Sequence, residues 1–152
     1  MMRITEIAQF NEAQFESATA LLIKFFIEEG FSTAPELIRE NLRLFLANDE
    51  SAVFLAEDEE KAVGVATVTT TFGIEFGRSA ELEDLYVLPE ARNQGAARRL
   101  INTVQNWCKQ RGCLTLAIVI TPEGEAKNGL SSFYQKLGFV ETDRRIMLGD
   151  LS

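Results

Sequence analysis

The feature that most constrains the fold of this chain of 152 residues is the stretch 81–99, ELEDLYVLPEARNQGAARR, in which a strand runs directly into a helix. Residues 89–94 form the turn, and Gly95 opens the helix. The first N–H groups of a helix have no intrahelical partner and carry partial positive charge, so a small residue there lets an anion approach the backbone. The stretch therefore predicts a phosphate or pyrophosphate site at the end of a strand, held mainly by main-chain donors.

The distribution of charge supports an anion site at this place. The formal net charge is −8, which argues against nucleic acid as a main partner. Residues 91–122 nevertheless contain no Asp or Glu. The basic residues of that span are Arg92, Arg98, Arg99, Lys109 and Arg111. An acidic chain thus carries one basic region, and it surrounds the glycine-opened helix.

Composition narrows the class of protein. Hydrophobic residues make up 46% and charged residues 25%, typical of one globular domain spanning 1–152. No apolar run reaches the roughly 18 residues of a membrane span, and residues 1–6 lack the apolar core of a secretion signal, so we expect a cytoplasmic protein. Cys108 and Cys113 are expected to be reduced thiols. Because the chain has no histidine, we expect no metal site, and a general base must be another group.

Hydrophobic spacing and stop residues predict the order of the elements. Asn11 and Gln14 form a helix-start pair, and Gly30 ends the first helix. A hairpin pair and a third strand follow a second helix, and a crossover helix then leads to an apolar strand. The expected strands are 2–8, 51–56, 62–72, 79–88, 113–120 and one or two within 139–148, and the expected helices are 11–30, 33–46, 95–111 and one ending at Gly138. This order predicts a mixed sheet in an α+β domain.

Two motifs resemble those of one known family. Residues 92–97 fit Arg/Gln-x-x-Gly-x-Gly/Ala. Residues 128–139 resemble Asn-x-x-Ala-x-x-Leu-Tyr-x-Lys-x-Gly-Phe, with Ser131 and Phe133 replacing Ala and Leu and with one residue instead of two between them. In this order and spacing they resemble the GNAT superfamily of acetyl-CoA-dependent N-acetyltransferases. The resemblance implies the GNAT fold, an α+β domain whose mixed central sheet of about six to seven strands has about four helices packed on both faces.

The resemblance also implies how acetyl-CoA would be bound. Backbone groups of the strand would pair with the pantetheine arm, and the turn would hold the pyrophosphate. The side chain of Arg92 either contacts phosphate or caps the turn. The implied cofactor-binding residues are Leu85, Tyr86, Val87, Arg92, Gln94, Gly95, Ala96, Ala97, Arg98, Asn128, Ser131 and Tyr134.

Residue chemistry suggests catalytic roles for groups in both motifs. An amine is mostly protonated at neutral pH and must lose a proton before it attacks, so a carboxylate base is useful. Glu81 and Glu83 both match acidic positions of the family, and Glu83 is slightly preferred as the base. Strict alternation would place Asp84 on the opposite face, with Leu82. Tyr134 would donate a proton to the departing CoA thiolate, and an amide near residue 87 would polarise the thioester carbonyl. Alternatively, the acids only bind positive charge or face solvent, and the phenol belongs to the core.

These features imply direct transfer of an acetyl group to a primary amine, without a covalent enzyme intermediate. The acidic strand favours a small cationic acceptor, such as an aminoglycoside-like compound or a polyamine. A protein N-terminus or lysine is an alternative acceptor, and a non-catalytic acyl-CoA-binding sensor is an alternative of another class. We also expect a homodimer, in which the partner or the loop 73–78 completes the acceptor site; neither a membrane nor a nucleic acid is an expected partner.

Overall fold

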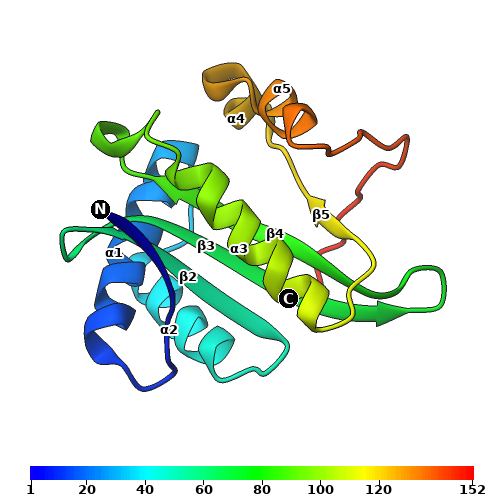
Figure 1. Ribbon diagram of the computed structural model, residues 1–152. Helices are drawn as coiled ribbons and strands as arrows, with labels where there is room; N and C mark the ends of the chain where they lie inside the picture. The colour runs from blue at the N-terminus through cyan, green and yellow to red at the C-terminus, as the bar shows by residue number, and fades with distance from the viewer. The chain divides into compact units, whose positions relative to one another are not determined.

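The computed structural model describes all residues from 1 to 152 and contains two compact units, Met1–Val119 and Ile120–Ser152. The first unit contains most of the secondary structure (Figure 1). Its elements are β1 (Met2–Glu6), α1 (Glu12–Glu29), α2 (Pro35–Leu46), β2 (Ser51–Asp58), β3 (Lys61–Gly73), β4 (Gly77–Val87), the short 3₁₀ turn η1 (Pro89–Ala91), α3 (Ala96–Gln110) and β5 (Leu116–Ile118).

The strands form one mixed sheet in the order β1-β2-β3-β4-β5. All neighbours are antiparallel except β4 and β5, which run parallel. The parallel ladder is short, because it joins Ala80–Leu82 of β4 to Leu116–Ile118 of β5 and then stops. Since β4 continues to Val87, residues 83–87 have no neighbouring strand on that side.

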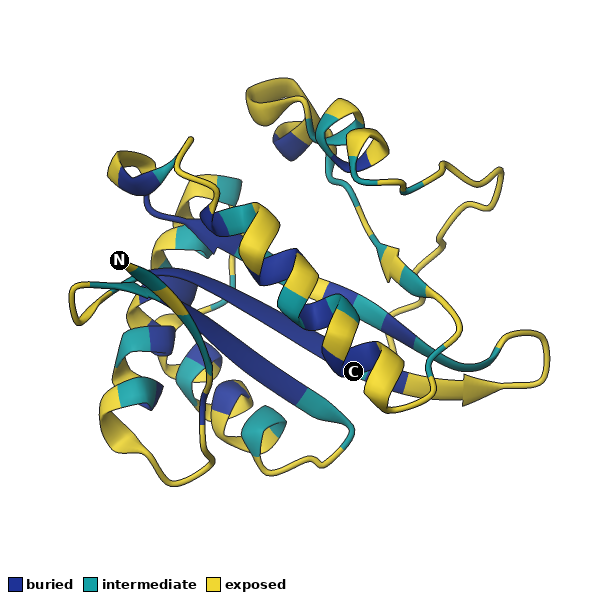
Figure 2. Cartoon of the chain, in the orientation of Figure 1, coloured by how far each residue is buried: buried dark blue, intermediate teal, exposed yellow.

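Helices cover both faces of this sheet, with α1 and α2 on one face and α3 on the other (Figure 1). A Cβ atom added at Gly64 would lie 3.2 Å from a methyl group of Leu100, which identifies the β3 face that α3 covers. The inner stripe of α3 includes Leu100, Ile101 and Val104, all at most 1% exposed, and burial of each such side chain contributes about 2 kcal/mol. Figure 2 shows the same division, with buried residues on the central strands and on the inner side of the helices.

The two helices of the first face are held together by paired charges. The side chain of Asn11 caps α1 by accepting from the N–H of Gln14 at 3.0 Å, as the sequence predicts, and Gly30 ends the helix at φ 75°. Arg39 of α2 donates two hydrogen bonds of 2.7 Å to Glu16 of α1. Arg43 pairs in the same way with Glu12, and its guanidinium lies 3.9 Å from the ring centre of the buried Phe15.

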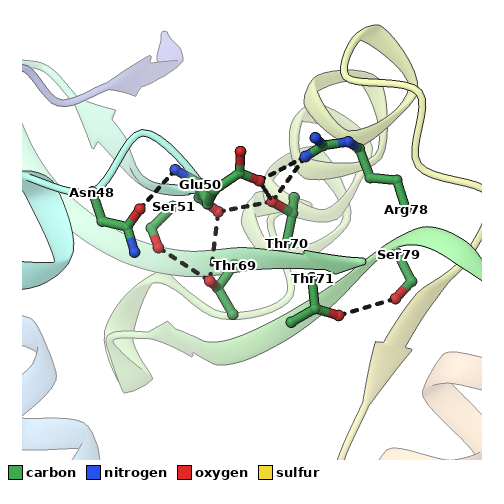
Figure 3. A network of polar contacts seen from close by, with 8 residues as sticks. All are labelled: Asn48, Glu50, Ser51, Thr69, Thr70, Thr71, Arg78 and Ser79. Carbon is green, nitrogen blue, oxygen red and sulfur yellow. Dashed lines mark hydrogen bonds and ion pairs between the residues drawn. The ribbon is translucent and has the colours of Figure 1, made fainter. Parts of the chain in front are cut away.

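A polar network stabilises the β3–β4 pair at the end next to the turn that joins the two strands (Figure 3). Glu50, in the link between α2 and β2, accepts a short hydrogen bond from the Thr70 hydroxyl and pairs with Arg78 at 2.6 Å. These two partners, Thr70 first, hold the pKa of Glu50 below its usual value. The carboxylate therefore ties the link before β2 to β3 and β4.

The second unit contains α4 (Pro122–Asn128) and α5 (Leu130–Lys136), separated by Gly129 at φ 58°. The α+β class is confirmed, with five strands and five α-helices, but the expected strand count of six to seven is too high. Residues 139–148 form no strand, because a strand needs a partner that pairs with its backbone and covers a face. Instead, Val140, Met147 and Leu148 are more than four-fifths exposed.

Candidate active site

The central feature of the candidate site is a β-bulge in β4 at Glu83. Thr67 of β3 pairs with Asp84, whereas its neighbour Val68 pairs with Leu82, so Glu83 is an extra residue opposite β3. Adjacent residues of β3 point to opposite faces of the sheet. Leu82 and Asp84 therefore lie on opposite faces, although they are two residues apart.

The bulge changes which face carries the acids. Asp84 does not share the face of Leu82, as strict alternation predicts; through its partner Thr67 it shares the face of Glu81, whose partner is Thr69. This face is the one that α1 covers, because the ring of Tyr86, two residues further along, lies 5.6 Å from that of Phe25.

The three acids of this stretch, Glu81, Glu83 and Asp84, make no ion pair. The only side-chain partner of Asp84 is Thr67, whose hydroxyl donates to the carboxylate at 2.5 Å. Burial raises the pKa of Asp84, and the charge of Glu81 adds to the increase. The pKa of Glu83 is raised as well, first by burial and then by its two acidic neighbours. In contrast to Glu50 at the other end of the strand pair, these carboxylates have no arginine or lysine partner.

The bulge also changes the direction of the backbone groups of β4. Before it, the N–H of Ala80 donates to the carbonyl of Thr115 at 3.0 Å, so even-numbered residues direct their polar groups toward β5. Just beyond the strand, the N–H of Leu88 donates to the carbonyl of Val63 at 2.8 Å, so even-numbered residues now face β3. One inserted residue accounts for this change of parity.

After the bulge, the backbone N–H and C=O groups of odd-numbered residues consequently point to the side of β4 on which the pairing with β5 has ended. These are Leu85 and Val87, whose N–H and C=O groups point to an edge without a strand partner, here called the open edge. The carbonyl of Val87 is the exception, because it accepts a hydrogen bond of 2.8 Å from Nε of Arg92. The open edge can therefore pair with an extended polar ligand much as a further strand would.

The turn between β4 and α3 follows directly, and two residues there have left-handed backbones. Asn93 has φ 65° and Gly95 has φ 86°. Gly95 is the N-cap of α3 and supplies no side-chain acceptor, so no side-chain cap satisfies the first N–H groups of the helix. A Cβ atom at Gly95 would meet no atom within 4 Å, so no other part of the chain crowds this glycine. The observed geometry fits a phosphate group at this helix start.

The basic residues around this helix start have different environments. Arg92 contacts the carbonyl of Val87 and the carboxylate of Glu28, the latter at 3.4 Å. Arg99 donates to the carbonyl of Met2 at 2.6 Å. Arg98 is exposed and makes neither an ion pair nor a side-chain hydrogen bond. Of these three arginines, Arg98 has the guanidinium that remains available to an anion.

The second motif lies in the second unit. Tyr134 on α5 is 7% exposed, and its ring packs against Phe133 at 5.1 Å and Phe139 at 5.5 Å between ring centres. Burial raises the pKa of Tyr134 to about 12, so the phenol stays protonated at neutral pH. Asn128, at the end of α4, is exposed, and the N–H of Ser131 donates to the carboxylate of Glu125 at 2.7 Å.

Comparison with known proteins agrees with this geometry. The model of the acetyltransferase (GNAT) family matches residues 15–139, and the chain belongs to that family. It is an acetyl-CoA-dependent N-acetyltransferase, as both motifs imply. The structure contains no group of His, Cys, Asp or Glu side chains that could hold a metal ion. None of its helices combines the length and apolar character needed to span a membrane.

Relatives of several kinds match most of the chain. Aminoglycoside N(6')-acetyltransferase type 1 of Serratia marcescens is 36% identical over 118 residues, which is 74% of this chain and 79% of that protein. Glucosamine 6-phosphate N-acetyltransferase 1 of Oryza sativa subsp. japonica is 32% identical over 119 residues, 72% of this chain and 68% of that protein. The structure of aminoglycoside N-acetyltransferase AAC(6')-Iy in complex with CoA superposes with a TM-score of 0.84 at 25% identity, covering 100% of this chain and 96% of the other.

Most of the site residues predicted within the stretch 81–99 lie along β4 and the turn that follows it. Glu81, Glu83, Leu85 and Val87 follow one another along β4, and the stretch 92–98 forms the turn and helix start beyond it. The sequence did not reveal Thr67 as the partner of Asp84. The imperfect alternation of 79–88 was the available sign, because an inserted residue breaks the period of two.

Replacing Gly95 by alanine tests the helix start as an anion site. A side chain at φ 86° is strained, and we expect Gly95→Ala to lower the free energy of unfolding by about 1 kcal/mol. It should also raise the Kd of CoA about tenfold, because relief of the strain moves the N–H donors. Gly112→Ala is the matched control, since Gly112 has φ 78° and equally open surroundings at the other end of α3. Equal CoA affinity of the two variants, measured by calorimetry, would contradict the site.

Replacing Asp84 by asparagine tests the unpaired carboxylate. Because folding raises the pKa of Asp84, the folded state prefers the protonated acid, and stability falls as pH rises from 3.8 through the raised value. We expect Asp84→Asn to raise Tm at pH 7 by about 2 °C, with a smaller difference toward pH 4. Glu50→Gln should do the opposite at pH 7, since the pKa of Glu50 is lowered. Thermal melts between pH 4 and 7 measure the Tm of both variants. A Tm for Asp84→Asn below that of the wild type at pH 7 would contradict the raised pKa of Asp84.

Proposed function

We propose that this enzyme acetylates a primary amine of a small polycation, such as an aminoglycoside-like compound or a polyamine. The observation that carries the proposal is the group of three carboxylates at the bulge, Glu81, Glu83 and Asp84, which has no basic partner. A cationic acceptor supplies the missing positive charge next to the open edge. The name of the Serratia marcescens relative, an aminoglycoside N(6')-acetyltransferase, supports the same acceptor class.

Glu83 is the proposed general base. It lies at the bulge beside the open edge, and its raised pKa brings a carboxylate closer to the neutral range in which a base is most effective. The amine must lose a proton before it attacks, and Glu83 accepts that proton directly or through a water molecule. Glu81 and Asp84 share the face of α1 and hold the remaining positive charge of the acceptor. Glu81 is the alternative base.

The first motif provides the proposed cofactor cradle. The open-edge N–H and C=O of Leu85 pair with the amide groups of the pantetheine arm, Tyr86 lies between the two open-edge residues, and Val87 holds the acyl end of the arm through its N–H. The N–H groups of Gln94, Gly95, Ala96, Ala97 and Arg98 surround the pyrophosphate, with the Arg98 guanidinium beside them. The N–H of Val87 polarises the carbonyl that the amine attacks.

The second motif provides the proposed acid. Tyr134 donates to the leaving sulfur, and Asn128 and Ser131 contact the pantetheine side, as the resemblance implies. A phenol with a pKa of about 12 holds its proton more tightly than a thiol with a pKa near 8.5. Tyr134 therefore acts first as a hydrogen-bond donor to the sulfur, which stabilises the leaving thiolate. We also propose one acetyltransferase domain spanning 1–152.

Assembly and location are further parts of the proposal. A homodimer is supported by the exposed apolar residues of the hairpin tip, Phe72, Ile74 and Phe76, and of the C-terminal segment. Either the partner or the loop 73–78 completes the acceptor site. A cytoplasmic location is supported by two free thiols, Cys108 and Cys113, one buried and one partly buried.

A thiol-release assay with a panel of amines tests the acceptor class. The panel contains an aminoglycoside, spermidine, glucosamine 6-phosphate and a peptide with free α- and ε-amines. We expect kcat/KM for the two polycations to exceed that for the anionic amino sugar about a hundredfold, because the carboxylates repel its phosphate. A preference for the peptide would favour a protein acetyltransferase. Stabilisation by acetyl-CoA without thiol release from any amine would favour an acyl-CoA sensor.

Replacing Tyr134 by phenylalanine tests the donor to the sulfur. The substitution removes only a hydroxyl from a packed ring, so we expect an unchanged Tm and a kcat about a hundredfold lower at saturating acetyl-CoA. The loss should be smaller with an acyl donor whose leaving thiol is more acidic, because that thiolate needs less stabilisation. Phe133→Leu, which alters the neighbouring ring instead, is the control for packing. Unchanged turnover of Tyr134→Phe would remove the role.

A further inference from the structure

Arg92 contacts three groups from separate parts of the first unit. Its Nε donates to the carbonyl of Val87 at 2.8 Å, and one terminal nitrogen lies 3.4 Å from the carboxylate of Glu28. Its guanidinium carbon lies 5.6 Å from the ring centre of Tyr86. The residue itself directly follows η1, in the turn that leads into α3. One side chain thus joins the end of α1, the end of β4 and the turn before α3.

The contact with α1 depends on an acid in an unfavourable place. Glu28 lies in the last turn of α1, where the helix carries partial negative charge and has no basic residue. Arg92 offsets this repulsion. Burial raises the pKa of Tyr86 to about 12, and the neighbouring carboxylate of Glu28 adds to the increase. Phe25, one turn earlier on α1, completes the contact by lying against the Tyr86 ring.

The contact with β4 fixes one peptide group on both sides. The carbonyl of Val87 is held by Arg92, and the N–H of the same peptide, from Leu88, is held by the carbonyl of Val63 at 2.8 Å. This peptide ends the open edge and adjoins the N–H of Val87. The N–H of Val87 belongs to the preceding peptide, which shares the Cα atom of Val87 with the held one. A shift of the held peptide would therefore move that Cα atom, and with it the N–H that is proposed to polarise the reacting carbonyl.

We propose that Arg92 is a positioning residue, which fixes the Val87 end of the open edge and couples it to α1, the helix on the acceptor side. This inference rests on the proposed function. It assigns to Arg92 a role other than phosphate binding, because the guanidinium is already committed to a carbonyl, a carboxylate and a ring. The unpaired Arg98 remains the proposed phosphate ligand.

Steady-state kinetics and CoA binding of Arg92→Gln test the assignment. We expect kcat at saturating acetyl-CoA and amine to fall about tenfold, because a small misplacement of reacting groups is costly, while the Kd of CoA changes less than about threefold. Arg39→Gln is the matched control: Arg39 pairs with Glu16, and its side chain is 43% exposed against 37% for Arg92. The control removes the closer ion pair of the two, with two contacts of 2.7 Å instead of one of 3.4 Å, and should still keep its kcat within about twofold.

Two results would overturn the inference. A tenfold weaker CoA affinity with unchanged kcat would make Arg92 a phosphate ligand, and a kcat equal to that of Arg39→Gln would leave it a structural role alone. Glu28→Gln is the second variant; it leaves the bond to Val87 intact, and we expect a loss of kcat of about threefold. If Glu28→Gln leaves kcat unchanged, the coupling of Arg92 to α1 is refuted.

Failure of the proposed function gives a different result. In that case the wild-type enzyme releases no thiol with any amine, whatever residue occupies position 92. The coupling is then decided by hydrogen exchange of Arg92→Gln and Arg39→Gln. Faster exchange in both 25–31 and 84–91 for Arg92→Gln alone supports it, and unchanged exchange in either segment overturns it.

Discussion

One inserted residue in β4 determines the arrangement of the candidate site. Without the bulge at Glu83, Asp84 would point with Leu82 toward α3, and the polar groups of Leu85 and Val87 would face β3. With it, the carboxylate lies on the α1 face and the backbone groups face the open edge. The same change thus supplies an acidic surface and an unpaired strand edge within a few residues of each other. No separate loop is needed to place either one.

The site separates the two kinds of charge that the reaction brings together. The carboxylates precede the open edge along β4, whereas the helix start with Gly95 and Arg98 follows it. A cationic amine and a polyanionic cofactor are therefore attracted to opposite ends of the same short stretch. Because the acids are excluded from 91–122, neither attraction weakens the other. The acidic net charge of the whole chain is compatible with anion binding for the same reason.

Most elements before residue 111 could be predicted from the sequence because they depend on local spacing, whereas the expected strand 113–120 shortens to Leu116–Ile118 and the expected last helix divides into α4 and α5. Asn11 and Gly30 mark the ends of α1, and the apolar stripe of α3 repeats with the helical period. The bulge could not be located in this way, because the inserted residue is defined only by the register with β3. The partners of Arg92 were equally hidden, since Glu28 is 64 residues away. The expected final strands failed for a similar reason: an extended segment becomes a strand only where a partner exists.

The two ends of the β3–β4 pair show why the unpaired acids are informative. At the end next to the turn that joins the two strands, Glu50 is neutralised by Arg78 and bonded to Thr70. This arrangement stabilises the folded chain and lowers the pKa of the carboxylate. At the bulge, Asp84 has a hydroxyl partner but no cation, and its pKa rises. The same pair of strands can thus accommodate a neutralised acid, so the lack of a cation at the bulge is not imposed by the fold. A carboxylate left without its counter-charge destabilises the free enzyme and gains most when a cation arrives, which is the property that an ammonium-binding site requires.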